Sequence, residues 1–280
     1  MKIVNINGGL GNQLFQYFFG KYVIGKDNKV TFLLNDIKNY NSHQGLELNK
    51  VINDQIHFQD TPNNLFHLTS VKKILNKISN INKKWGGHYF EDPKIIISKK
   101  DINKNNFFCG YWQNIDYLDK FRTEIINDLT FIIDKKNKDQ IRLISEVDNS
   151  VSIHFRKGDY LNSKEHFNLG IEYYSAAIEY VEKSYEKPKY FIFSDDVAWA
   201  KDSLKHLSCD FNFVEINHEK DSYLDMNLMS KCKINIIANS TFSWWASFIN
   251  NHFQKKVIAP NNWFNHKDSY LYSIDMKKIL

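Results

Sequence analysis

The residues best suited to chemistry in this chain lie in one short segment, His154-Phe155-Arg156-Lys157-Gly158-Asp159-Tyr160. It follows a strand-like run at residues 151–153, so its charged groups should stand at the carboxyl end of a strand, where open α/β sheets form ligand-binding crevices. A planar guanidinium grips phosphate oxygens bidentately, which suits Arg156 to a diphosphate-bearing ligand. Asp159 is a candidate to orient Arg156 or to accept a proton, and His154 is either a ligand contact or a packed core histidine. The alternative for the whole segment is a solvated charge cluster on a loop.

A second candidate site is the glycine turn Asn7-Gly8-Gly9-Leu10-Gly11-Asn12-Gln13. Gly9 and Gly11 permit positive φ and a close approach of the backbone to a ligand, and the start of the following helix attracts negative charge. Asn12 and Gln13 add amide groups at the mouth of the predicted crevice. The turn has neither the GxGxxG spacing of a dinucleotide site nor the Lys-Ser/Thr of a P-loop, so ordinary turn chemistry is the alternative.

The acid pair in Ser194-Asp195-Asp196 is open to two interpretations. Paired carboxylates suit a metal ion, whereas Ser194 or Asp195 could instead cap the helix that follows. No histidine or further carboxylate stands at matching spacing, and Mg²⁺ usually shares its ligands with substrate phosphates. We therefore expect no metal site.

The last polar constellation lies near residues 225–245. Asp225 sits among apolar residues of a predicted helix, and a buried carboxylate needs a partner. The paired N–H donors on the edge of a guanine base would serve. Polar side chains then gather at a helix start, where they and the backbone N–H groups form a cradle for phosphate or ribose; they are Asn239, Ser240, Thr241 and Ser243. We expect Trp244 and Trp245 to pack that helix rather than to bind sugar.

Composition limits the classes of protein to which this chain can belong. At 280 residues, with 42% hydrophobic and 25% charged residues, it is long enough to fold as one large domain or two ordinary ones. The net charge of +5 is modest and no arginine-rich block is present, so we expect no nucleic-acid partner. Three scattered cysteines indicate a reducing compartment. The chain begins with strand-like residues and has no signal-peptide pattern or membrane-spanning run, so we expect a cytoplasmic protein.

The elements that must position these residues form two α/β halves. The first opens with a strand at residues 2–6, the glycine turn, a helix at 11–26 and a strand at 29–34, which is typical of a parallel α/β unit. Residues 35–106 are less regular and predict short helices and long loops. A strand at 107–111 and a helical pattern at 114–133 follow, and the polar run at 134–139 is either a boundary or an exposed connection.

In the second half, strands alternate with helices, which predicts a parallel sheet covered on both faces. The expected strands are residues 151–155, 189–193, 211–215, 234–238 and 256–259, and the expected helices are residues 170–186, 197–207, 222–231 and 241–251. We predict two consecutive α/β domains, residues 1–148 and 149–280, that face each other across a cleft.

Five blocks together resemble the bacterial α-1,2-fucosyltransferases of glycosyltransferase family 11. They occur in the family's order between residues 8 and 247; they are GGLGNQLFQY at 8–17, GYWQ at 110–113, HFRKGDY at 154–160, FSDD at 193–196 and NIIANSTFSWWAS at 235–247. At position 157 the chain has lysine where the family pattern HxRRxDY has a second arginine. Lysine keeps the charge but lacks the planar fork, so the phosphate role falls to Arg156.

The resemblance implies a GT-B-like pair of Rossmann-type domains and transfer of L-fucose, with inversion, from GDP-β-L-fucose to O2 of a galactose. No metal or other cofactor is implied. Arg156 would hold the β-phosphate, and His154 and Asp225 would contact guanine. Asn12 would face the fucose and the acceptor. The remaining donor-site residues suggested by the motifs are Gly9, Gly11, Asp195, Asn239, Ser240, Thr241 and Phe242.

Several functional alternatives stay open at this point. The expected acceptor is a galactose-containing glycan, such as a lipopolysaccharide O-antigen repeat, and peripheral contact with the inner membrane is an additional expectation. A GT-B enzyme of another linkage or donor would share the same motifs. A non-catalytic carbohydrate- or nucleotide-binding protein is the rival of a different class. Asp159 and His154 are both candidates for the catalytic base, and a loose transition state would need little base assistance.

Overall fold

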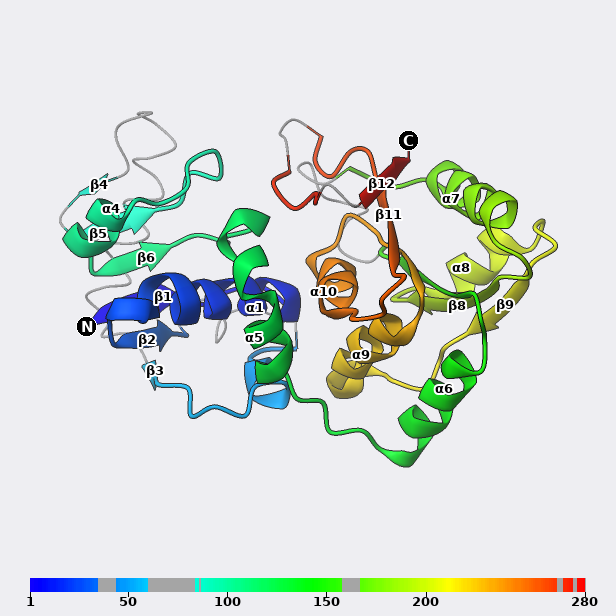
Figure 1. The fold of residues 1–280 in the computed structure, drawn as a ribbon, viewed down its shortest axis with the longest axis horizontal. Coiled ribbons are helices and arrows are strands. Elements are labelled where there is room, and N and C mark those ends of the chain that lie inside the picture. The colour runs from blue at the N-terminus through cyan, green and yellow to red at the C-terminus, as the bar shows by residue number, and fades with distance from the viewer. Residues whose placement is uncertain are drawn as a thin grey trace. The chain divides into compact units, whose positions relative to one another are not determined.

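The computed structural model describes residues 1–34, 44–59, 84–85, 87–157, 167–265, 269–273 and 276–279. The chain divides into two compact units, Met1–Thr130 and Phe131–Leu280, and each contains its own six-stranded sheet (Figure 1). The boundary comes before the polar run at 134–139 and earlier than the expected split near residue 148. The glycine turn lies in the first unit, and Arg156, Asp195 and Ser240 lie in the second.

The boundary differs from the prediction because helix α6 (Lys135–Ser145) belongs to the second unit. Asp134 caps this helix by accepting a hydrogen bond from the Asn137 N–H. Asn137 in turn is paired with Asn217 of the same unit through two side-chain hydrogen bonds. The polar run that the sequence left open is therefore a helix start, not a linker.

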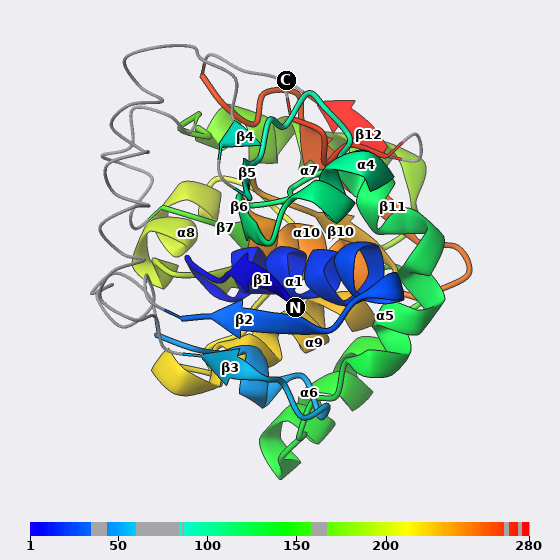
Figure 2. The same ribbon diagram turned by 90° about the vertical axis from the view of Figure 1, so that its left-hand side faces the viewer.

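Unit 1 is built on a sheet with strand order β3-β2-β1-β6-β5-β4. All neighbouring strands are parallel except the β4–β5 pair. The strands are β1 (Lys2–Asn5), β2 (Val30–Leu33), β3 (Phe58–Gln59), β4 (Lys84–Trp85), β5 (His88–Phe90) and β6 (Phe107–Cys109). Figure 2 shows β1, β2 and β3 following one another across this sheet. The predicted strands at 2–6, 29–34 and 107–111 are confirmed, while β3, β4 and β5 were not predicted.

The helices of unit 1 are more broken than the periodicity suggested. The expected helix at 11–26 consists of α1 (Leu10–Phe18), a π-helical segment (Phe19–Ile24) and a 3₁₀ turn (Gly25–Asp27). In place of one helix at 114–133 there are two 3₁₀ turns, Ile115–Tyr117 and Asp119–Phe121, and then α5 (Arg122–Asp128). A further 3₁₀ turn (Leu48–Lys50) and α4 (Lys99–Lys104) lie in the region expected to be irregular.

Unit 2 has an all-parallel sheet with strand order β12-β11-β10-β7-β8-β9. The chain moves outward from β7 to β9, returns to β10 beside β7, and then moves outward in the other direction. This is the Rossmann order, whose ligand crevice forms where the direction reverses. Here the reversal lies between β7 and β10. The strands are β7 (Ser150–Phe155), β8 (Lys189–Ser194), β9 (Asp210–Phe213), β10 (Ile234–Ile236), β11 (Lys256–Pro260) and β12 (Met276–Ile279).

Helices cover both faces of this sheet, as predicted (Figure 1). One face carries α7 (Ile171–Ser184) and α8 (Val197–Leu204), which pack on Val151, Ile153 and Phe155 of β7. Successive side chains of a strand point to opposite faces. Ser152 and His154 therefore face the other layer, which contains α9 (Tyr223–Lys231) and α10 (Thr241–Ile249). A 3₁₀ turn (Glu219–Asp221) precedes α9.

Two compositional expectations can be compared with the fold. Within the described residues, no helix is both long and apolar enough to cross a membrane. Cys232 is buried, whereas Cys109 and Cys209 are only half-buried.

Candidate active site

The polar motifs of unit 2 converge on the carboxyl edge of its sheet. Arg156 follows β7, Asp195 follows β8, and Ser240 precedes α10 on the segment after β10. Because these strands are parallel, their carboxyl ends meet at one edge. The topology therefore brings together residues that are up to 84 positions apart along the chain, counting from Arg156 to Ser240, at the place where this fold binds ligands.

Arg156 is held in place by Asp195. Its Nη1 lies 3.0 Å from Asp195 Oδ2, and both side chains are about a quarter exposed, at 27% and 24%. The other oxygen of Asp195 accepts the backbone N–H of Lys157 at 2.9 Å. One carboxylate thus fixes both the guanidinium and the backbone of the segment that follows β7. The geometry makes Asp195 a positioning residue for Arg156, while the predicted direct contact of Asp195 with the donor stays a prediction.

Lys157 has a structural role. Its ammonium donates to the Leu169 carbonyl at 2.7 Å and lies 4.1 Å from the centre of the Trp199 ring. The side chain is buried, and burial lowers its pKa. A cation used in this way stabilises the α7–α8 face of the sheet, which agrees with the assignment of the phosphate role to Arg156 alone.

His154 is buried at 6% exposure and lies beside Phe242, with 5.8 Å between the ring centres. Burial, and secondarily the charge of Arg156, lower the pKa of His154 to about 3. The imidazole is therefore neutral at physiological pH. Its Nδ1 is buried without a hydrogen-bond partner among the described residues. An unsatisfied buried nitrogen is costly, so the choice between ligand contact and core packing moves toward a ligand contact.

The two acidic residues after β8, Asp195 and Asp196, each have their own structural partner. Asp196, not Ser194 or Asp195, caps α8 by accepting the Trp199 N–H at 2.9 Å. Ser194 Oγ accepts the Asp196 N–H. Our prediction of the capping residue was wrong because Asp195 is used by Arg156. Across the described ranges, no group of three or more His, Cys, Asp or Glu side chains is placed to hold a metal ion.

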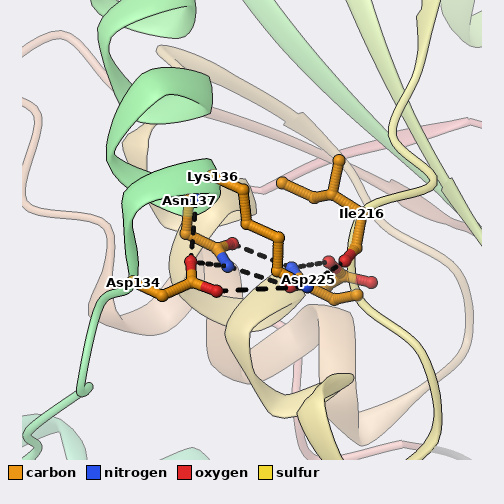
Figure 3. Close-up of polar contacts among 6 residues, drawn as sticks. Asp134, Lys136, Asn137, Ile216 and Asp225 are labelled. Carbon is orange, nitrogen blue, oxygen red and sulfur yellow. Dashed lines mark hydrogen bonds and ion pairs between the residues drawn. The ribbon is translucent and has the colours of Figure 1, made fainter.

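Asp225, on α9, has a protein partner that the sequence did not reveal. Asn217 Nδ2 donates to Asp225 Oδ1 at 2.7 Å. Burial nevertheless raises the pKa of Asp225 to about 7, against the opposing effects of Asn217 and Lys136. Figure 3 shows Asp225 together with Lys136, Asn137 and Asp134. A carboxylate that is expensive to charge and is nevertheless placed among polar groups is typical of functional sites.

The segment before α10 has divided roles. Asn239 is buried, and its Nδ2 donates to the carbonyls of Phe167 and Trp263, so no amide hydrogen remains for a ligand. Ser240 is the N-cap of α10, and its Oγ accepts the Phe242 N–H at 3.3 Å. Thr241 and Phe242 are half-buried in the first turn. The helix start is therefore an anion-attracting terminus, while Asn239 fastens two loops.

The packing role expected for the tryptophans is confirmed. Trp244 and Trp245 are fully buried. Trp244 Nε1 donates to the Leu271 carbonyl at 2.7 Å, and its ring stacks on Phe248 with 4.9 Å between centres. Neither ring is available for a sugar.

Unit 1 repeats the arrangement at the carboxyl edge of its own sheet, between β1 and β6. The glycine turn follows β1 and the GYWQ block follows β6. Gln113 Nε2 donates to Asn12 Oδ1 at 2.8 Å. Gly8 has φ of +75°, and a Cβ there would lie 2.5 Å from Asn12 Nδ2. Glycine at position 8 thus allows the Asn12 amide to fold over the turn, and the sequence did not predict Gln113 as its partner.

Gln113 follows a strained residue. Trp112 has φ of +57°, a left-handed conformation that is unfavourable for a bulky side chain. It is held there by Glu91 Oε2, which accepts the Trp112 N–H at 2.9 Å, and by a stacked contact with Phe19 at 3.8 Å between ring centres. Strain of this kind is often found at ligand sites. In the sequence, only the GYWQ block at 110–113 indicated that this position has a special role.

The other residues of the glycine turn are structural or backbone elements. Gly9 is the N-cap position of α1 and Gly11 lies in its first turn. Gln13 is buried, and its amide bonds Gly8, Gly45 and Glu47. The prediction that Gln13 opens toward a crevice is therefore wrong. Asp159, the remaining predicted catalytic residue, lies outside the described residues.

The two α/β units, each built on a largely parallel sheet, have a GT-B-like fold, as predicted. The chain belongs to glycosyl transferase family 11, whose family model matches residues 1–275. It is 32% identical over 282 residues to an alpha-1,2-colitosyltransferase of Escherichia coli, with 95% of this chain and 93% of the relative covered.

Two further similarities agree with this family. The O-antigen biosynthesis glycosyltransferase WbnK of Escherichia coli is 29% identical over 290 residues, covering 92% of this chain and 93% of the relative. A solved structure of a mutant Arabidopsis thaliana FUT1 in complex with GDP aligns with a TM-score of 0.50 at 12% identity, covering 92% of this chain and 69% of that one. The structural similarity supports the fold.

Proposed function

We propose that this chain is an inverting α-1,2-fucosyltransferase that moves L-fucose from GDP-β-L-fucose to O2 of a galactose in a glycan such as an O-antigen repeat. The observation that carries the proposal is Arg156 at the carboxyl end of β7, held by Asp195. Membership of glycosyl transferase family 11 and the names of the two bacterial relatives support it.

In the proposed reaction, the bond between fucose C1 and the β-phosphate oxygen of GDP breaks, and C1 bonds to galactose O2 on its opposite face. The bonding pair leaves with GDP, so negative charge grows on the diphosphate. Arg156 and the first N–H groups of α10 would offset that charge. Removal of a single such donor costs about 2–4 kcal/mol in other enzymes, which makes metal-independent transfer reasonable.

The nucleoside would be held by residues around α9 and α10. We assign the guanine contacts to His154 and Asp225, and the phosphate and ribose contacts to Ser240, Thr241 and Phe242. The unsatisfied Nδ1 of His154 supports its assignment, since a ligand would supply the missing hydrogen bond. The half-buried Asp225 carboxylate can accept the two N–H donors of guanine.

The proton of the galactose O2 hydroxyl must leave during transfer. His154 is a poor candidate for the base, because an imidazole with a pKa of about 3 binds a proton weakly at neutral pH. We keep Asp159 as the candidate base. In unit 1, we assign Asn12, with the backbone of Gly9 and Gly11, to the fucose and the acceptor.

The test is the release of GDP when the protein is mixed with GDP-fucose and a β-galactoside, measured with and without EDTA. The proposal requires turnover that EDTA does not reduce, and an α-1,2 linkage in the product by NMR. Saccharide binding without consumption of the nucleotide sugar would instead indicate a non-catalytic binding protein. Loss of activity in EDTA would refute metal independence.

A second candidate donor is GDP-colitose, which differs from GDP-fucose by lacking the 3-hydroxyl group. It is favoured by the 32% identity to a colitosyltransferase. Competition between equal concentrations of the two donors, read from the products by mass spectrometry, decides between them. We also propose that the reaction takes place in the cytoplasm with peripheral contact to the inner membrane, which cell fractionation would test.

A further inference from the structure

A continuous row of hydrogen bonds joins the start of α6 to Asp225 (Figure 3). Asn137 Nδ2 donates to Asp134 Oδ1 at 2.8 Å and to Asn217 Oδ1 at 2.9 Å. Asn217 Nδ2 donates to Asn137 Oδ1 at 2.9 Å and to Asp225 Oδ1 at 2.7 Å. The row therefore reads carboxylate, amide, amide, carboxylate, and all four amide hydrogens are used.

The two carboxylates determine the orientation of both amides. An ionised carboxylate only accepts hydrogen bonds, so each asparagine must turn its nitrogen toward its neighbouring aspartate. Rotating either amide by half a turn would point its oxygen at the neighbouring carboxylate. The reciprocal hydrogen bonds between Asn137 and Asn217 would also be lost. Asn137 is fully buried and Asn217 is 7% exposed, so water competes little for these bonds.

A second contact holds the same segment. Lys136, next to Asn137 on α6, donates through Nζ to the carbonyl of Ile216, which precedes Asn217. The backbone that carries Asn217 is thus attached to α6 at two adjacent positions. Lys136 and Asn217 both favour the ionised form of Asp225, against the burial that opposes it.

The position of Asp225 connects this row to recognition of the base. Guanine offers two N–H donors on one edge, from N1 and the 2-amino group, and a carboxylate in a fixed plane can accept both. A bond from Asn217 to one oxygen restricts rotation of that plane. Hypoxanthine, the base of IDP, has the N1 donor but no 2-amino group. The difference between GDP and IDP binding therefore measures the contact between Asp225 and the 2-amino group.

We propose that the Asn137–Asn217 amide pair is a positioning device that orients the Asp225 carboxylate for the two N–H donors of guanine and so sets selection of GDP over IDP. The inference rests on the proposed function, because it takes Asp225 as the guanine contact. It adds Asn217 and Asn137 as determinants of base specificity that act through Asp225.

The test is isothermal titration of GDP and IDP into the full chain and into two variants, Asn217→Asp and Asn137→Asp. The first removes the donor to Asp225. The second leaves Asn217 in place but removes the Asn137 N–H that donates to its Oδ1, so the reciprocal amide pair is lost. The parent should bind GDP at least about tenfold more tightly than IDP, as expected for a hydrogen bond to a charged group. Both variants should lose most of that preference, mainly through weaker GDP binding.

Asn149→Asp is the matched control. Asn149 belongs to the same unit and lies just before β7, at the amino end of the sheet, and its amide donates to the Glu186 carbonyl. It should keep the parent's preference. Folded variants of the pair that still prefer GDP as the parent does would overturn the inference and leave the proposed function intact. A parent that binds neither nucleotide would refute the proposed function, and one that binds both equally would refute the guanine contact. Loss of the fold in both pair variants would also overturn the inference, by showing a purely structural role.

Discussion

The raised pKa of Asp225 predicts that this residue reduces stability at neutral and alkaline pH. Burial raises the pKa from 3.8 to about 7, so the folded state binds the proton more tightly than the unfolded chain does. The contribution to stability is present in full below about pH 4 and is lost as the pH rises to about 7. Each pKa unit corresponds to about 1.4 kcal/mol, which sets an upper limit of about 4 kcal/mol for the loss.

Asp225→Asn removes the charge and keeps an oxygen that can accept from Asn217. We expect the variant to exceed the parent in the free energy of unfolding at about pH 8, by up to that limit, and to approach it at about pH 4. Urea denaturation across this range measures the difference. The variant should also bind GDP more weakly, because an amide has a single oxygen and its NH2 group would face one of the two guanine N–H donors.

The control for that experiment is Asp202→Asn. Asp202 is solvent-exposed, and its hydrogen bond with Lys205 lowers its pKa, so the substitution should not stabilise the protein at about pH 8. A stability difference between Asp225→Asn and the parent that does not change with pH would refute the reasoning, since it would show that the carboxyl group is not the titrating cause.

Three further predictions concern the neighbouring groups. Asp195→Asn should weaken GDP binding by about fivefold to thirtyfold with a near-normal melting temperature, since Arg156 loses its anchor; unchanged binding would deny that role. Lys157→Met should lower the melting temperature while leaving the Kd for GDP unaltered, because its ammonium bonds the Leu169 carbonyl. Gln113→Ala and Asn12→Ala should each reduce kcat/KM, and the double variant should lose less than the two effects combined; simple additivity would argue against a functional pair.

The second half of the chain was largely predictable from its sequence. Strands such as β7 and β8 are six residues long, and they alternate with amphipathic helices. Hydrophobic periodicity is a strong signal over such lengths. The parallel topology could then be predicted from the alternation of strands and helices, because parallel strands need a crossover connection, which is usually a helix.

The first half was less predictable for physical reasons. Strands β3 and β4 have two residues each, too few to show a period. The helix expected at 11–26 changes to π geometry at Phe19, close to Gly20, where a Cβ would lie 2.5 Å from the Phe32 ring. A tertiary contact of this kind leaves no local pattern in the sequence.

At the site, the sequence indicated which residues carry the charged groups but not which residues are their partners. Arg156 and Asp225 stood out because charged groups beside apolar runs need an explanation. Their partners Asp195 and Asn217 depend on which loops the fold brings together, and they lie 39 and 8 positions away. The two hydrogen bonds by which Asn239 fastens two loops could not be predicted, because in sequence such an amide looks like one that binds a ligand.

We propose above all that Arg156 neutralises the diphosphate of the departing nucleotide. The most direct measurement is the Kd for GDP of Arg156→Ala, by titration calorimetry, with the melting temperature as the control for folding. We predict a loss of affinity of about tenfold to a hundredfold, as expected for a charged hydrogen-bond donor, in a protein that melts like the parent. An unchanged Kd in a folded variant would contradict it.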